Sequence, residues 1–189
     1  DKQQNAICIN LSGHNSGKRV YIVASGHGDA LRFQRLATSL GSRAHLILLQ
    51  PPVDPDDHQL QTVQDMANLY YQKIQAENYA LPFCVTGFSI GGVTALETAR
   101  VCLAHGLQVD DLVMLDTIYP GWLIRRTPLW KIILKWGDYR NKKAVNSGKI
   151  LPRRLFTEKG LWSQVTAMQS YDPQLMNVPV VLVMTTSLG

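Results

Sequence analysis

The chain has 189 residues, of which 46% are hydrophobic and 17% are charged, and its formal net charge is +5. This length fits one domain with a substantial core, and this composition argues against disorder. No apolar run reaches the length of a membrane span, the N-terminus does not resemble a signal peptide, and nothing resembles a nucleic-acid-binding module. The three cysteines have no metal-ligand spacing and lie in strand-like or helical segments. We therefore expect a cytoplasmic protein with reduced, buried thiols and no bound metal.

Apolar runs of strand type alternate with helical patterns along most of the chain. Strands are expected at residues 6–11, 19–24, 45–49, 82–86, 112–115 and 178–184. Helices are expected after Asp29, over about 20 residues that include the periodic apolar positions from Leu60 to Ile74, and after Ser89. Strands that are apolar throughout and alternate with helices are typical of a parallel sheet covered on both faces, which is an α/β fold.

A serine stands where the fourth strand meets the third helix. Gly87, Ser89 and Gly91 fit the G-x-S-x-G pattern in the strand–turn–helix context that this pattern requires. Small residues on both sides let the two segments pass close together, so the Ser89 hydroxyl is expected to stand clear above the sheet edge. The bland alternative is an ordinary turn that contains a serine. The flanking strand and helix favour a nucleophile.

A serine nucleophile needs an acid, a base and oxyanion donors. Asp116 ends the next strand, so it is expected at the same sheet edge as Ser89, either as the acid of a triad or as a turn cap. The oxyanion hole is expected to use the backbone N–H of Ile90, directly after the nucleophile, and that of Gly26 in the loop after the second strand.

The usual order along the chain is serine, then acid, then histidine. In this sequence no histidine follows Asp116, so the base is missing from its usual place. The five histidines all precede Asp116: His14, His27, His45, His58 and His105. We expect surface or capping roles for most of them, and the position of His27 suits the oxyanion loop better than the base. The hypothesis is that the catalytic histidine follows Gly189 in a longer protein, which agrees with the absence of an initiator methionine.

These residues resemble the thioesterase domains of polyketide and nonribosomal peptide synthetases, which belong to the α/β-hydrolase superfamily. The resemblance is carried by the segments 20–28 with 33–37, 83–100 and 112–117, although Ala24-Ser25 stand where the family usually has His-Gly or His-Pro. It implies an α/β-hydrolase fold, a mostly parallel sheet with helices on both faces and a helical lid insertion. It also implies transfer of an acyl chain from the phosphopantetheine thioester of a carrier protein to Ser89, with no cofactor bound by the domain itself.

The resemblance implies that residues 1–189 form a single thioesterase domain, which lacks its C-terminal segment. Residues 120–175 are expected to form a lid insertion in this domain. Apolar lid residues are expected to line the acyl channel: Trp122, Leu129, Trp130, Ile133 and Trp136. The lid region is also strongly basic, which indicates either an acidic partner such as the acyl or peptidyl carrier protein, or simply a solvated face. Two alternatives stay open for function. They are a general serine esterase, and a non-catalytic carrier-binding module if no histidine follows Gly189.

Overall fold

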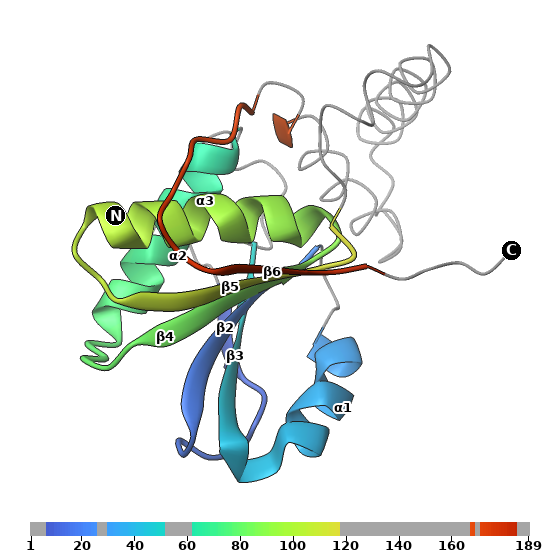
Figure 1. The fold of residues 1–189 in the computed structure, drawn as a ribbon. Coiled ribbons are helices and arrows are strands. Elements are labelled where there is room, and N and C mark those ends of the chain that lie inside the picture. Colours follow the sequence, from blue (N-terminus) through green and yellow to red (C-terminus); the bar gives the residue numbers. More distant parts are fainter. Residues whose placement is uncertain (1–6, 26–29, 52–61, 118–166, 169–170, 185–189) are drawn as a thin grey trace, which may run out of the picture.

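The computed structural model describes residues 7–25, 30–51, 62–117, 167–168 and 171–184, and every structural statement below concerns these ranges (Figure 1). Within them lies one six-stranded sheet with the order β1-β3-β2-β4-β5-β6. Its strands are β1 (Ile7–Asn10), β2 (Lys18–Val23), β3 (Ala44–Gln50), β4 (Phe83–Phe88), β5 (Val109–Leu115) and β6 (Val180–Val183). β1 pairs antiparallel with β3, and every other pair is parallel. The predicted parallel sheet is therefore confirmed, apart from its antiparallel edge strand β1.

Helices cover both faces of this sheet (Figure 1). They are α1 (Ala30–Leu40), α2 (Val63–Ala76) and α3 (Ile90–Ala104), and a short 3-10 turn, Gly41–Arg43, follows α1. α1 packs on one face, while α2 and α3 lie side by side on the other. This arrangement confirms the prediction of an α/β fold with two covered faces.

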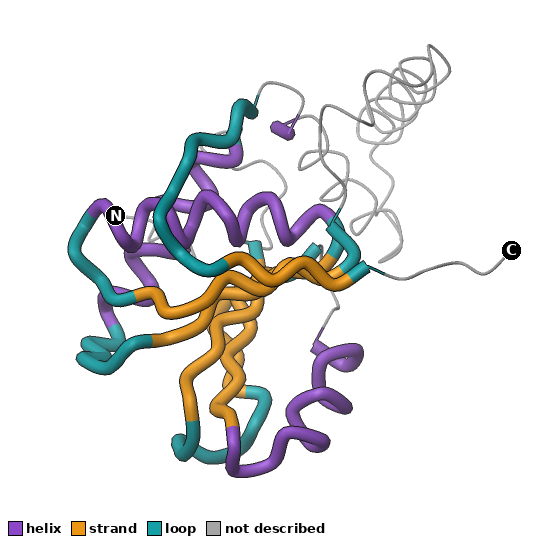
Figure 2. Tube along the Cα trace, in the orientation of Figure 1, coloured by secondary structure: helices purple, strands orange, loops and turns teal. Residues whose placement is uncertain are grey.

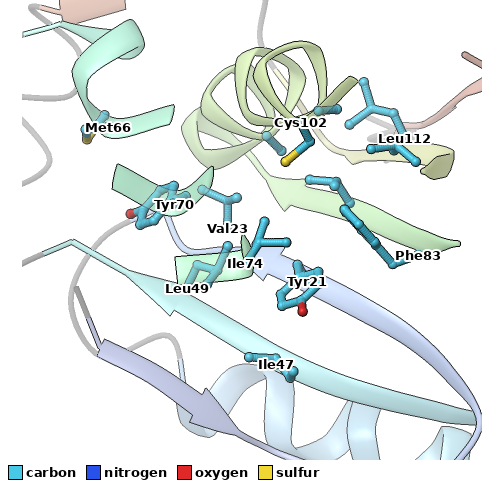
Figure 3. Packing of buried hydrophobic residues seen from close by; sticks show 14 of the residues in the cluster. Tyr21, Val23, Ile47, Leu49, Met66, Tyr70, Ile74, Phe83, Cys102 and Leu112 are labelled. Atoms are coloured by element: carbon cyan, nitrogen blue, oxygen red, sulfur yellow. The ribbon is translucent and has the colours of Figure 1, made fainter. Parts of the chain in front are cut away.

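The strand residues alternate between two hydrophobic clusters, one for each face. Tyr21 and Val23 of β2 belong to the cluster beneath α2 and α3, which Figure 3 shows, and the ring of Tyr21 meets the edge of Phe83 at 5.2 Å between centroids. Ile22 and Ala24 belong to the cluster beneath α1. Because successive strand side chains point to opposite faces, a run that is apolar throughout can bury every residue only when both faces are covered.

The boundaries differ from the sequence-based expectation in α2. This helix has 14 residues, fewer than expected, because Thr62 is its N-cap residue and forms a capping box with Asp65. The Thr62 hydroxyl accepts a hydrogen bond from the Asp65 backbone N–H at 3.0 Å, and the Asp65 carboxylate accepts one from the Thr62 backbone N–H at 3.0 Å. These bonds satisfy backbone donors that the first helical turn otherwise leaves unpaired.

Two predictions about single side chains were wrong. Cys8 is exposed on β1, whereas Cys84 and Cys102 are buried as expected. β1 is an edge strand, so its alternate residues face solvent. His45 was expected at the surface, but it lies on β3, all of whose residues are buried, and is 3% exposed.

Residues 171–179 return to the sheet as a loop. Figure 2 shows this loop crossing in front of the helices before it enters β6. Met176 and Val178 pack against the cluster beneath α2 and α3. No helix in the described part of the chain is both long enough and apolar enough to cross a membrane.

Candidate active site

Ser89 occupies a strained turn between β4, which ends at Phe88, and α3, which begins at Ile90. Its backbone angles are φ 53° and ψ −124°, a combination that side chains with a Cβ rarely adopt. Such a conformation costs about 1–3 kcal/mol and persists only where the surroundings impose it. The sharp strand-to-helix turn predicted from the sequence is therefore present.

The glycines around Ser89 impose the turn by allowing backbone segments to touch. A Cβ on Gly87 would lie 2.5 Å from the carbonyl carbon of Gly91 and 2.6 Å from the Cα of Gly92. A Cβ on Gly91 would lie 2.5 Å from the carbonyl oxygen of Val23. Since all of these neighbours are backbone atoms, neither glycine can be replaced without moving a strand or the helix.

The end of β2 also lies against this turn. The Ala24 N–H donates to Leu49 O at 3.0 Å, and a Cβ on Gly91 would approach the carbonyl carbon of Ala24 to 3.0 Å. The chain that leads toward Gly26 therefore starts beside the first turn of α3. Gly26 and His27 themselves lie outside the described residues, as do the expected channel residues Trp122, Leu129, Trp130, Ile133 and Trp136.

Ile90 is the first residue of α3, so its N–H is one of the donors that a helix cannot satisfy internally. The same turn is closed by the Gly92 N–H, which donates to Ser89 O at 3.1 Å. Free N–H groups and the positive end of the helix dipole favour an anion at this point. The geometry is suited to an oxyanion next to Ser89.

Asp116 leaves the neighbouring strand at the same level as Ser89. Phe88 of β4 pairs with Leu115 of β5, and the Ser89 N–H donates to Leu115 O at 2.8 Å. On its other side the Asp116 N–H donates to Val183 O of β6 at 2.6 Å. Asp116 also has a positive φ of 49°, so it turns sharply out of its strand. The structure thus brings Ser89 and Asp116 to one edge of the sheet, as the sequence predicted.

The next residue, Thr117, fixes the distance between that strand end and α3. Thr117 is 7% exposed, and a Cβ on Gly92 would lie 2.7 Å from its Cγ2 and 2.8 Å from its Cβ. The chain after Asp116 therefore packs directly onto the helix that follows Ser89. The sequence analysis did not single out this pair, although a second glycine after Gly91 was the available signal.

None of the three described histidines lies near Ser89. His45 pairs with Arg19 at the start of β2 and β3, the edge opposite to Ser89, and His14 lies 6.4 Å from His45 between ring centroids. His105 ends α3, about 22 Å from its start for a helix of 15 residues. There it stacks on Tyr71 at 4.3 Å, and its Nδ1 lies 2.9 Å from Val101 O. The expected capping role of His105 agrees with this contact.

A comparison with protein-family models decides what kind of domain carries this turn. The model of the thioesterase domain matches residues 18–128, which is more than half of the chain. The chain belongs to the thioesterase-domain family.

Relatives of this thioesterase domain are large synthases. It is 30% identical over 173 residues to the non-reducing polyketide synthase ntnG of a Nectria species, covering 88% of the chain and 8% of that synthase. It is 24% identical over 104 residues to the nonribosomal peptide synthetase apvA of Aspergillus terreus, covering 55% of the chain and 11% of that synthetase. The chain therefore spans about a tenth of the length of these relatives.

Solved structures confirm the α/β-hydrolase type of fold. The NocB thioesterase domain of the nocardicin cluster, in covalent complex with a fluorophosphonate nocardicin G analogue, superposes with a TM-score of 0.75 at 24% identity. The match covers 96% of this chain and 78% of the NocB chain. Among the described residues, no group of three or more His, Cys, Asp or Glu side chains could hold a metal ion.

The thioesterase domain also contains a buried charged residue that the sequence analysis did not single out. Glu97 on α3 is 1% exposed and accepts hydrogen bonds from Arg100 and from Tyr171. Its signal in the sequence was a glutamate three residues before an arginine on an otherwise apolar helix.

On the other face of the sheet, Phe88 contacts the ring of Phe33, and the Arg32 guanidinium lies 4.9 Å above the Phe88 ring.

Proposed function

We propose that this domain is a thioesterase that releases an acyl, polyketide or peptidyl chain from the phosphopantetheine thioester of a carrier protein. The observation that carries the proposal is the backbone of Ser89, which is held at φ 53° between β4 and α3 by glycines that nothing larger can replace. Strain of this kind is typical of functional positions, because it has no value for stability. The thioesterase-domain match and the synthase relatives support the thioester as substrate.

In the proposed first step, Ser89 Oγ attacks the thioester carbonyl carbon while a histidine takes the hydroxyl proton. The tetrahedral oxyanion is held by the N–H groups of Ile90 and Gly26 until the C–S bond breaks. The thiol of the phosphopantetheine arm then leaves with the proton from the histidine, and an ester to Ser89 remains. Removing one oxyanion donor typically raises the barrier by about 3–4 kcal/mol.

In the second step, water or a nucleophile of the chain itself attacks the acyl-Ser89 ester, which gives hydrolysis or cyclisation respectively. The histidine takes the proton of the attacking group and gives it to Ser89 Oγ as the C–Oγ bond breaks, which restores the free serine. Asp116 orients the histidine and stabilises its charged form. Phe88 pairs with Leu115, so the residues that follow them, Ser89 and Asp116, leave the sheet at the same edge. This placement supports the proposed role of Asp116. The histidine itself is proposed to follow Asp116 in the full-length protein, as in the usual chain order.

The remaining parts of the proposal concern the surroundings of the site. Residues 120–175 form the lid of a single thioesterase domain, and the apolar residues expected there line the channel for the acyl chain. The excess of basic residues in this region is suited to an acidic carrier protein or to the phosphate of its arm.

The experiment that tests the function is a comparison of thioester and oxygen-ester hydrolysis by the full-length protein. We expect faster turnover of an acyl-pantetheine thioester than of the matching ester, and loss of both activities in Ser89→Ala. Ser39→Ala on the exposed face of α1 is the matched control and should be unaffected. Preference for the oxygen ester would instead support a general esterase. Absence of both activities in the wild-type protein would support a non-catalytic carrier-binding module.

A further inference from the structure

The helix α1 carries an unbalanced positive charge. Residues 30–43, which comprise α1 and the 3-10 turn after it, contain three arginines and no aspartate or glutamate. The other two described helices are balanced, since α2 contains one aspartate and one lysine, and α3 contains one glutamate and one arginine. Among the described helices, α1 is therefore the one whose charge favours an anionic partner.

Two arginines of α1 have no carboxylate partner in the described part of the chain. Elsewhere in that part, Arg19 and Arg100 pair with glutamates, and Arg43 donates to two backbone carbonyl groups at the end of α1. Arg32 and Arg35 are both exposed, and neither forms an ion pair with a described residue. Their guanidinium groups remain available to carboxylates of another molecule.

The same face of α1 carries an exposed apolar side chain. Arg32, Arg35 and Leu36 follow the spacing i, i+3, i+4, so they are neighbours on the helix surface. Leu36 is 37% exposed, whereas Phe33 and Ala37 are buried against the sheet. An exposed leucine beside two arginines is a composition that suits a protein interface, where apolar contacts are surrounded by polar groups and arginine is enriched. We call Arg32, Arg35 and Leu36 the outward face of α1.

The outward face begins beside the turn at Ser89. The ring of Phe33 meets that of Phe88 at 6.4 Å between centroids, and the Arg32 guanidinium lies 4.9 Å from the centroid of the Phe88 ring. Phe88 directly precedes Ser89. From there α1 extends for 11 residues, about 16 Å, and ends next to the start of β3 (Figure 1). A partner on this face is close to Ser89 without occupying the site.

We propose that the outward face of α1 docks the carrier protein that presents the thioester to Ser89. This inference rests on the proposed function, because it names the surface on which the partner of that reaction binds. Arg32 and Arg35 pair with carboxylates on the carrier, and Leu36 contacts one of its apolar side chains. The phosphopantetheine arm then crosses from the carrier to Ser89. A folded partner fits this face better than a small anion, which would leave Leu36 uncovered.

The kinetic test compares one acyl group on two carriers, added in trans to the full-length protein. The substrates are the decanoyl thioesters of pantetheine and of a bacterial acyl carrier protein. In Arg35→Glu we expect the ratio of kcat/KM for the carrier substrate to kcat/KM for the pantetheine substrate to fall about tenfold. Arg35→Lys, which keeps the charge, should retain most of the ratio.

Lys73→Glu is the matched control, because it makes the same change of net charge on α2, across the sheet. Its ratio should equal that of the wild type. An unchanged ratio in Arg35→Glu, an equal fall in Lys73→Glu, or a wild-type protein that does not prefer the carrier substrate would overturn the proposal.

Binding without turnover tests the contact directly. The probe is the same acyl carrier protein with an amide in place of the decanoyl thioester, and its affinity is measured by fluorescence anisotropy. We expect Arg35→Glu to weaken binding about tenfold at about 0.1 M salt, and the difference to shrink at about 1 M salt because the charges are screened. An equal loss for the matching amide of phosphopantetheine alone would show that the face holds the phosphate of the arm, and would overturn the carrier protein as its occupant.

The two proposals can fail separately. If Ser89 is not acylated but binding of the carrier depends on Arg35, the docking face exists and the domain is a non-catalytic carrier-binding module. If Ser89 is acylated and Arg35→Glu uses and binds the carrier like the wild type, the proposed function stands and the docking face is refuted.

Discussion

The Ser89 N–H donates a hydrogen bond to the carbonyl oxygen of Leu115 at 2.8 Å. This bond crosses from the turn at Ser89 to the residue directly before Asp116. On the other side of β5, the Asp116 N–H is bound to Val183 O at 2.6 Å. The spacing between the proposed nucleophile and the proposed acid is therefore set by paired strands and not by flexible loops, as preorganised catalysis requires.

The contact between Gly92 and Thr117 should couple helix packing to the site. We expect Gly92→Ala to destabilise the protein by about 1–3 kcal/mol and to lower acylation of Ser89, because the new Cβ overlaps the Thr117 side chain and pushes the chain after Asp116 away. Denaturant unfolding and acylation rates measure the two effects.

A double mutant serves as the control for that overlap. Thr117→Ala removes Oγ1 and Cγ2, the atoms nearest to the new Cβ, so it should recover part of the loss caused by Gly92→Ala. Strictly additive effects of the two substitutions would show that Gly92 is required for another reason.

Stability should fall on acidification because of His45. Burial lowers the pKa of His45 below its ordinary value of 6.5, and the nearby Arg19 and His14 lower it further, while Glu77 acts in the opposite direction. Between the folded pKa and about 6.5 the unfolded chain holds more protons, so the free energy of unfolding falls as pH falls. The slope from this residue is at most about 1.4 kcal/mol per pH unit.

The measurement is urea unfolding of the wild type and of His45→Leu from about pH 8 to about pH 5. The wild type should lose more stability than the variant over this range, with the difference appearing below about pH 6.5. Parallel curves would mean that His45 has the same pKa in the folded and unfolded states.

The thiols should differ in reactivity. Burial raises the pKa of Cys84 to about 11 and that of Cys102 to about 12, whereas Cys8 is exposed although desolvation raises its pKa as well. At about pH 8 we expect a disulfide reagent to label Cys8 slowly in the folded protein and all three cysteines in denaturant. Native labelling of Cys84 or Cys102 at the rate of Cys8 would contradict the packing of β4 and α3.

Much of the fold could be predicted because the pattern of apolar residues is local information. Residues 20–23 of β2 and 46–49 of β3 are all apolar, which indicates burial on both faces, and the structure confirms it in the alternation of Tyr21 and Ile22 between two clusters. The antiparallel direction of β1 could not be predicted, since a run of four residues fits either direction. The burial of His45 was missed for a related reason, because a polar residue at a strand end gives no sign of what covers it.

The site was predicted where backbone sterics determine it and missed where distant segments meet. Gly87 and Gly91 predict the turn at Ser89 from a stretch of five residues. The position of Asp116 beside Ser89 follows from the parallel pairing of β4 with β5. The bond between Glu97 and Tyr171 joins residues 74 positions apart, so no local pattern could reveal it. The roles of Ser89, Asp116, Ile90 and Gly26 in catalysis stay predictions for experiment.

The most direct test of the account is to locate the acyl group after the full-length protein has reacted with an acyl-pantetheine thioester. Rapid acid quenching, digestion and tandem mass spectrometry identify the modified side chain. The account predicts the acyl mass on the Ser89 hydroxyl, and accumulation of this ester when Asp116→Asn slows its release. Acylation at another residue, or product formation at an unchanged rate by Ser89→Ala, would contradict it.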